Sequence, residues 1–135
     1  MDKKHPFACV AVFVRNWKNE YLIGERRANT ATAGKNEFCI PGGKIDWRED
    51  PEEAAIRETK EEAGIEIRID ELLGVGSDKW STSDKHFITI YYLATITKGT
   101  PSEKEPEKLG NWKFLPKHEI PQLFATAGTM LCKLP

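Results

Sequence analysis

The sequence has too few cysteines to build a disulfide framework or a zinc site. The number of cysteines is odd, and no two of them form a Cys-x-x-Cys pair; they are Cys9, Cys39 and Cys132. We therefore expect reduced, buried thiols in a cytoplasmic protein. An excess of one charge is also missing, because 20 basic and 21 acidic residues leave a formal net charge of −1. Without a general basic field we expect no stable nucleic-acid binding, and an acidic substrate must be met by local positive charge.

Long hydrophobic runs and linkers are missing as well. The apolar run from Phe7 to Val14 is too short to cross a membrane, and it lacks a convincing cleavage region after the basic N-terminus. It is typical of a core strand covered on both faces. No repeat or low-complexity linker divides the 135 residues, so we expect a single domain over residues 1–135 and no membrane association.

The pattern of apolar residues predicts a sheet that lies between two helical layers. A turn at Asn16–Asn19 should join residues 7–14 and 21–26 in a hairpin, and residues 116–135 should form a short C-terminal helix, since Pro121 and Gly128 interrupt a longer one. The other expected strands are residues 37–40, 65–76, 86–97 and 111–115, with polar loops at residues 27–36, 77–85 and 98–110.

The strongest helix signal begins at Asp50. Asp50 can cap the helix, Pro51 fits its first position, and Glu53 completes an Asp-x-x-Glu capping box. Gly64 is placed to end the helix in the left-handed conformation. Four small residues allow this helix to lie close to a sheet, namely Ala54, Ala55, Thr59 and Ala63.

Three acids crowd the last two turns of that helix. Glu58 shares a face with both Glu61 and Glu62, although like charges at this spacing repel and acids near a helix C-terminus oppose the macrodipole. One interpretation is a solvated acidic face relieved by Arg57 and Lys60. The other is a site for a hard cation such as Mg²⁺ or Mn²⁺, which prefers carboxylate oxygens. The acids alone leave both open.

The surrounding residues favour the cation. The segment from Gly43 to Ile65 resembles the Nudix box, G-x5-E-x7-R-E-U-x-E-E-x-G-U, where U is bulky and apolar; only Thr59 departs, standing where an aliphatic residue is usual. The preceding "PGG" and the later "EPEKLGNWKFLPKHEIPQLF" are similar to small nucleotide-hydrolysing Nudix proteins of the MutT type. This resemblance implies a Nudix-type α/β/α sandwich with a mixed, largely antiparallel sheet. The matching residues are Gly43, Glu49, Arg57, Glu58, Glu61, Glu62, Gly64 and Ile65.

The resemblance also implies a chemistry, in which water attacks a phosphorus atom of a nucleoside diphosphate linked to another group. Mg²⁺ or Mn²⁺ would screen the phosphate charges and lower the pKa of the water. Arg57, paired with Glu49, would hold the carboxylates. The implied metal ligands are the carboxylates of Glu58, Glu61 and Glu62 and the carbonyl of Gly43, with Glu61 and Glu62 also counted among the catalytic residues.

Family members usually add one acid from a loop before the last strand, as a metal ligand or general base. Glu107 has the expected spacing, five residues before Trp112, and is our first choice. Glu105 is the second choice, and Glu103 also lies in this loop. A merely solvated charged loop is the alternative.

Substrate binding needs positive charge for phosphate and an apolar surface for the base. Arg27 and Lys44 are our preferred phosphate-binding residues, with Arg26 beside them, because arginine can grip a phosphate with two bonds. Any of them can instead be an ordinary surface residue. The candidates for stacking on a base, which can equally belong to the core, are Trp80, Phe87 and Phe124.

The first functional hypothesis is a nucleoside triphosphate pyrophosphohydrolase that gives a nucleoside monophosphate and pyrophosphate, including modified or oxidised deoxynucleotides. A nucleoside diphosphate sugar hydrolase is the alternative, since "LIGERRAN…AGKNEF" resembles the GDP-mannose hydrolase branch, although the box of that branch is altered and this one is intact. A non-catalytic nucleotide-binding module is a third hypothesis, but such modules usually lose the box acids. The preferred base and a homodimer remain open.

Overall fold

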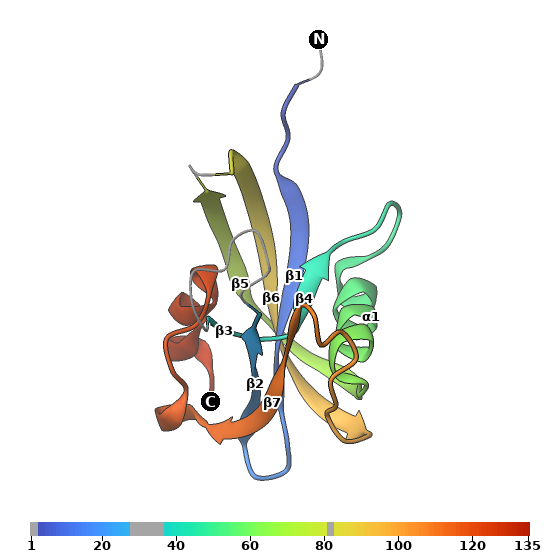
Figure 1. The fold of residues 1–135 in the computed structure, drawn as a ribbon, viewed down its shortest axis with the longest axis vertical. Helices are drawn as coiled ribbons and strands as arrows, with labels where there is room; N and C mark the ends of the chain where they lie inside the picture. The colour runs from blue at the N-terminus through green and yellow to red at the C-terminus, as the bar shows by residue number, and fades with distance from the viewer. Residues whose placement is uncertain (1–2, 28–36, 81–82) are drawn as a thin grey trace.

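The computed structural model describes residues 3–27, 37–80 and 83–135, and within them seven strands form one sheet (Figure 1). The path of the sheet is β3-β2-β1-β6-β5, with β4 paired to β1 and β7 paired to β2. The strands are β1 (Phe7–Arg15), β2 (Glu20–Arg26), β3 (Phe38–Cys39), β4 (Gly42–Lys44), β5 (Glu66–Trp80), β6 (Lys85–Lys98) and β7 (Leu109–Pro116).

Strand β1 makes the sheet mixed, because it runs parallel to β6 and antiparallel to β2 and β4. On its other edge β1 has two partners. At its end Arg15 pairs with Tyr21 of β2, whereas nearer its start Val10 pairs with Gly43 of β4. The sheet therefore opens between β1 and β2, and the short strand β4 enters the opening beside β1.

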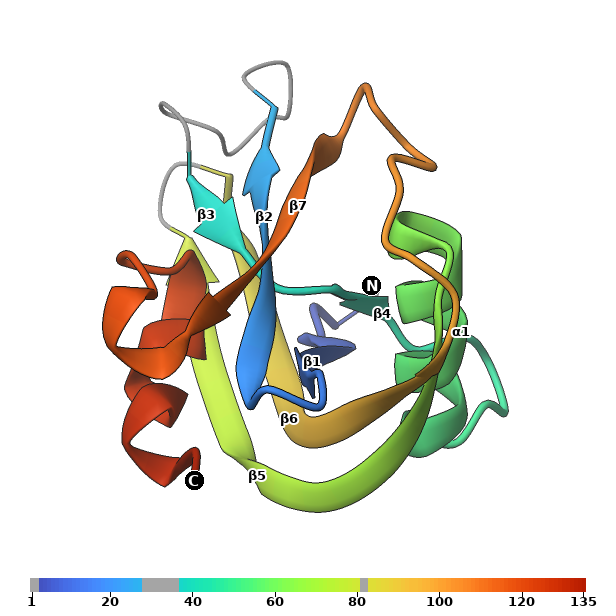
Figure 2. The same ribbon diagram turned by 90° about the horizontal axis from the view of Figure 1, so that it is seen from below.

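Two helical layers cover the sheet on opposite sides (Figure 2). Helix α1 (Pro51–Ala63) packs on Val10, Val12 and Val14 of β1, while Phe13 faces the other core. The second layer consists of two 3₁₀ segments, η1 (Lys117–Glu119) and η2 (Ala125–Lys133), of which η2 covers the second core. The alternation along β1 confirms a strand buried on both faces, and the α/β/α sandwich is confirmed.

Helix α1 begins and ends as its sequence predicts. The Glu53 side chain accepts the Asp50 N–H at 2.9 Å, and Pro51 is the first helical residue. Gly64 lies in the left-handed region at φ 71°, and its N–H binds the Lys60 carbonyl. These caps fix the rotation of the helix and so the direction in which its acids point.

Some expectations need correction. Residues 77–80 and Lys85 are strand rather than loop, because β5 and β6 stay paired as far as Trp80 and Lys85. The short C-terminal helix is present as the 3₁₀ helix η2, whereas Cys132 is exposed rather than buried. The loop expected at 27–36 lies almost entirely outside the described residues. Among the described segments, no helix has the length and apolar character needed to span a bilayer.

Candidate active site

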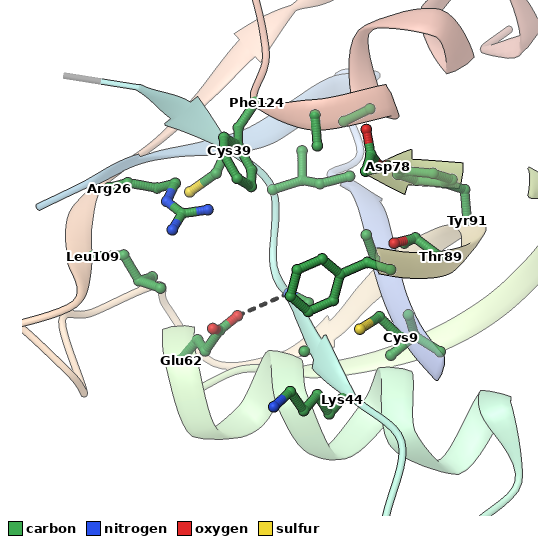
Figure 3. A pocket seen from close by; sticks show the side chains of 18 of the residues that line it. Cys9, Arg26, Cys39, Lys44, Glu62, Asp78, Thr89, Tyr91, Leu109 and Phe124 are labelled. Atoms are coloured by element: carbon green, nitrogen blue, oxygen red, sulfur yellow. Dashed lines mark hydrogen bonds between the residues drawn. The ribbon is translucent and has the colours of Figure 1, made fainter. Parts of the chain in front are cut away.

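A cavity of about 450 Å³ occupies the opening of the sheet between β1 and β2 (Figure 3). This volume is in the range of small-molecule sites. Its wall is built from β1 to β6, from Glu62 of α1, and from the segments around Leu109 and Phe124. In Figure 3, Glu62 and Lys44 lie on one side of the cavity, whereas Asp78 and Tyr91 lie on the other. The cavity thus has an acidic end and an aromatic end.

Arg57 is the centre of the hydrogen-bond network beside the acidic end. Its Nε and Nη2 donate to the two carboxylate oxygens of Glu49 at 2.7 and 2.9 Å. Its Nη1 donates to Glu58 at 2.8 Å and to Glu61 at 3.2 Å, and Nη2 also reaches the Lys44 carbonyl at 3.0 Å. The hydrogen bond from Arg57 lowers the pKa of Glu49 to about 2. Arg57 therefore relieves the repulsion between Glu58 and Glu61 and fixes where they point.

Glu58 lies directly against strand β4. A Cβ at Gly43 would overlap the Glu58 carboxylate, so only glycine leaves room for that carboxylate beside the strand. Burial raises the pKa of Glu58, while the hydrogen bond and charge of Arg57 oppose that rise. The glycine at position 43 therefore serves a close approach of helix and strand rather than a turn.

Glu62 is held differently from the other two acids. Its side chain is only 7% exposed, and its Oε1 accepts the Gly42 N–H at 2.8 Å (Figure 3). Burial raises the pKa of Glu62 to about 8, and the charges of Glu58 and Glu105 add to the rise. A buried carboxylate with one backbone donor and acidic neighbours is costly unless a proton or a cation balances it. Glu62 is therefore the acid that most needs a bound cation.

The loop before β7 brings Glu105, rather than Glu107, towards the helix acids. The negative charge of Glu105 raises the pKa of both Glu58 and Glu62. Its carboxylate is partly buried and lies 3.6 Å from Lys108 Nζ, while Glu107 is exposed. The geometry thus favours the second choice made from sequence spacing. The turn that follows Glu105, in which the Lys108 N–H donates to the Glu105 carbonyl at 2.9 Å, holds Glu105 beside Lys108.

Of the predicted phosphate-binding residues, Arg26 and Lys44 line the cavity and Arg27 does not. Arg27 donates to Glu103 at 2.9 Å and to the Pro106 carbonyl at 3.0 Å, so its guanidinium supports the loop before β7. The sequence favoured Arg27 as a phosphate-binding residue, but its guanidinium contacts the loop before β7 and not the cavity. Lys108 is a further cation of the cavity wall, which spacing alone did not single out.

All three predicted stacking residues line the cavity. Trp80 and Phe124 stack with ring centroids 5.3 Å apart and 12° between their planes, and the Arg26 guanidinium lies 3.8 Å from the Phe124 ring centroid. Phe87 stacks on Phe7 at 5.5 Å. The cavity is thus lined by the stacked pair Trp80–Phe124 and by Phe87, which stacks on Phe7, and aromatic rings of this kind can stack on a base.

Sequence reasoning missed three polar residues of this aromatic end, namely Asp78, Thr89 and Tyr91. A signal was present, because strand residues two apart share a face. Thr89 and Tyr91 follow Phe87 at that spacing in β6, and Asp78 precedes Trp80 in β5. Because residues 77–85 are polar and resemble a loop, the two-residue spacing of Asp78 and Trp80 did not indicate a strand.

The donors at the acidic end suit a hard divalent cation, since they are carboxylate oxygens and backbone. The Glu58 carboxylate, which lies against Gly43 where a Cβ would overlap it, and the buried carboxylate of Glu62 both fit such an ion. Across residues 3–27, 37–80 and 83–135, no three His, Cys, Asp or Glu side chains are arranged so that they could hold a metal together. In this arrangement Glu58 and Glu61 are hydrogen-bonded to Arg57, while Glu62 accepts the Gly42 N–H.

Comparison with known proteins assigns the chain to a family. The model of the NUDIX domain matches residues 5–134. The chain is 36% identical over 102 residues to the 8-oxo-dGTP diphosphatase of Escherichia coli K12, covering 76% of this chain and 75% of that protein. It is 32% identical over 105 residues to the 8-oxo-dGTP diphosphatase of Proteus vulgaris, covering 78% and 89%.

A solved structure agrees with these relatives. The MutT NUDIX hydrolase of Burkholderia pseudomallei superimposes with a TM-score of 0.83 at 25% identity, covering 97% of this chain and 98% of that one. Nudix hydrolases generally use divalent metal ions, which fits the donors around Glu62. The chain therefore belongs to the Nudix family, as a MutT-like pyrophosphohydrolase that acts on nucleoside diphosphate-linked substrates.

Proposed function

We propose that this protein hydrolyses nucleoside triphosphates to a nucleoside monophosphate and pyrophosphate, and that modified or oxidised deoxynucleotides are among its substrates. The observation that carries the proposal is a single cavity with Glu62 at one end and the stacked rings of Trp80 and Phe124 at the other. A base stacked on those rings directs the phosphates of the same nucleotide towards Glu62. The relatives named 8-oxo-dGTP diphosphatase support an oxidised purine nucleotide as one substrate.

The phosphates meet positive charge from three sides of the cavity. Lys44 extends from β4, Arg26 ends β2, and Lys108 precedes β7. Arg26 is additionally held against Phe124, so its charge lies where the aromatic end meets the phosphates. Arg27 retains a supporting role, because its bonds to Glu103 and Pro106 position the loop that carries Lys108.

Glu58, Glu61 and Glu62, together with the Gly43 carbonyl, would hold Mg²⁺ or Mn²⁺. When bound, it screens phosphate charge and lowers the pKa of the attacking water. Arg57 keeps Glu58 and Glu61 in place and, through Glu49, ties α1 to the loop that precedes it. Gly42 holds Glu62 towards the cavity with its N–H. Binding a cation allows Glu62 to remain ionised in its buried position.

Glu105 is the loop acid that orients the attacking water. Its charge already acts on Glu58 and Glu62, and Lys108 Nζ lies 3.6 Å from its carboxylate. A general base must lie within hydrogen-bond reach of the water from which it takes a proton. Glu105 comes from the loop beside the C-terminal end of α1, where the Ser102 N–H donates to the Ala63 carbonyl, and its charge acts on Glu58 and Glu62 from there. Glu107 remains the competing candidate from sequence spacing.

A substrate panel tests the proposal. Purified protein is incubated with the deoxynucleoside triphosphates, 8-oxo-dGTP, GDP-mannose and a dinucleoside tetraphosphate, with Mg²⁺, with Mn²⁺ or with a chelator. We expect monophosphate and pyrophosphate from the triphosphates, and no reaction with the chelator. Faster release of sugar from GDP-mannose would favour the nucleotide-sugar hydrolase instead. Tight nucleotide binding without any product would favour a non-catalytic module.

A further inference from the structure

Asp78 is an acid at the aromatic end of the cavity, far from the helix acids in sequence. It lies on β5, directly opposite Phe87 of β6 in the strand register and two residues before Trp80. In the described part of the chain its carboxylate forms no ion pair, and its hydrogen bonds come from Thr126 alone. A carboxylate beside aromatic rings without a cation needs further hydrogen-bond donors. A bound ligand can supply them.

A directional chain of hydroxyls orients this carboxylate. Thr126 Oγ1 donates to Asp78 Oδ2 at 2.9 Å, because an ionised carboxylate can only accept. The hydroxyl of Thr126 has one proton, so at the 2.7 Å contact with Tyr91 it is the Tyr91 hydroxyl that donates. Burial raises the pKa of Tyr91 to about 12, which keeps this donor protonated. A Cβ at Gly76 would overlap Thr126, so the glycine makes room for the chain.

This arrangement leaves Asp78 Oδ1 as an acceptor at the cavity wall. Every bond from Thr126 goes to Oδ2, and within the described residues no donor reaches Oδ1. The hydroxyl of Thr89, whose residue is 9% exposed, also lines the cavity, and the described chain gives it no hydrogen-bond partner (Figure 3). The aromatic end thus offers a fixed acceptor beside a hydroxyl that can donate or accept.

We propose that Asp78 determines base specificity and selects a guanine-type purine, an inference that rests on the proposed function. Guanine presents adjacent N1–H and N2–H₂ donors, which suit a carboxylate acceptor. Adenine and cytosine place a ring-nitrogen lone pair beside their amino group, so the same carboxylate repels part of that edge. Thymine offers one N–H between two carbonyl oxygens. Thr89 is free to donate to the guanine O6 carbonyl.

Binding of the reaction products tests Asp78 without any catalytic step. Dissociation constants of dGMP, dIMP and dAMP are measured by calorimetry for the wild type, Asp78→Asn and Asp84→Asn, a matched control in the β5–β6 turn that pairs with Lys4. Loss of a hydrogen bond to a charged group predicts at least about 10-fold weaker binding of dIMP, which lacks the N2 amino group, and of dAMP. Asp78→Asn should reduce both ratios towards one, while Asp84→Asn leaves them unchanged.

Equal affinity of the wild type for dGMP, dIMP and dAMP would overturn the inference without reference to any variant. Unchanged ratios in Asp78→Asn would overturn it equally. Thr126→Val tests the positioning chain, since it should weaken dGMP binding and lower the dGMP preference, whereas Thr126→Ser, which keeps the hydroxyl, restores both. A lowered melting temperature without a change in preference would reduce Thr126 to a structural role.

The same proteins separate this inference from the proposed function. With dGTP and dATP as substrates, Asp78→Asn should bring the ratio of their kcat/KM values closer to one, while both triphosphates are still cleaved to monophosphate and pyrophosphate. Pyrophosphate release with an unaltered base ratio would overturn the role of Asp78 alone. Selective dGMP binding without pyrophosphate release would overturn the proposed function alone.

Discussion

The two ends of the cavity are built in contrasting ways. At the acidic end, one arginine binds Glu49, Glu58 and Glu61 within a single continuous segment of sequence. At the aromatic end, Trp80, Phe87 and Phe124 come from separate elements and meet only in the folded chain. Charge at fixed local spacing organises the first end, and sheet register with ring stacking organises the second. We therefore expect variants at the acidic end to change the rate and variants at the aromatic end to change the choice of substrate.

The largest effect is expected at Glu62. Glu62→Gln keeps an oxygen that can accept the Gly42 N–H but removes the charge, so turnover should fall at least about 100-fold with the fold intact. Steady-state kcat with Mg²⁺ and the melting temperature of the metal-free protein are the measurements. Glu52→Gln, in the exposed first turn of α1, is the matched control and should behave as wild type. Near-wild-type turnover of Glu62→Gln would refute a catalytic role for this acid.

Arg57 should affect both rate and stability. Arg57→Ala frees Glu58 and Glu61 to repel each other, so we expect turnover to fall about 30-fold, within the range for catalytic groups displaced by about an ångström. The melting temperature should fall by about 5 °C, because several charged hydrogen bonds are lost. Lys60→Ala on the same helix is the control. Full stability with full activity in Arg57→Ala would show that the network has no organising role.

The loop before β7 offers a direct comparison of two acids. Since the charge of Glu105 acts on Glu58 and Glu62, Glu105→Ala should slow turnover at least about 10-fold. Glu107→Ala should slow it less, although sequence spacing favours Glu107. Parallel kcat measurements decide between them. A larger fall in kcat for Glu107→Ala than for Glu105→Ala would assign the catalytic loop acid to Glu107. Wild-type kcat in both variants would mean that the acids of α1 act without this loop.

The smallest effect concerns acid stability at Glu49. The hydrogen bond from Arg57 lowers the folded-state pKa of Glu49 to about 2 from an ordinary value of 4.5. The folded protein therefore binds fewer protons here than the unfolded chain between these values, and the stabilisation present above pH 4.5 is lost as the pH falls towards 2. Melting temperatures from pH 6 to pH 2.5 should fall more steeply for the wild type than for Glu49→Gln. Parallel curves would contradict the shift.

The same contrast explains what the sequence could predict. The helix from Pro51 to Ala63 and the grouping of its acids follow from local spacing, since the caps and the 3.6-residue period need no information from distant residues. The buried strand β1 was likewise evident from its continuous apolar run. In contrast, the bonds from Arg27 to the Glu103 side chain and the Pro106 carbonyl depend on how β2 and β7 pair.

Long-range pairing also hid the polar residues of the aromatic end. Asp78 meets Thr126 across 48 positions of sequence, and no local pattern marks that contact. The strand residues 77–80 are polar because they face a cavity and solvent, which made them resemble a loop. In the C-terminal segment Leu123, Ala127 and Met130 pack on the second core at the i, i+4, i+7 spacing of an α-helix. The backbone of Ala125–Lys133 nevertheless forms 3₁₀ turns, which this spacing did not predict.

The nature and stoichiometry of the products test the proposed chemistry most directly. Nucleotides and phosphates released from dGTP by the wild type are quantified by ion-exchange chromatography, with Mg²⁺ and with a chelator. We expect dGMP and pyrophosphate in equal amounts with Mg²⁺ and neither product with the chelator, because Glu58, Glu61 and Glu62 need a bound cation to act on the phosphates. Formation of dGDP and phosphate, or full activity in the chelator, would contradict a metal-dependent pyrophosphohydrolase acting on nucleoside triphosphates.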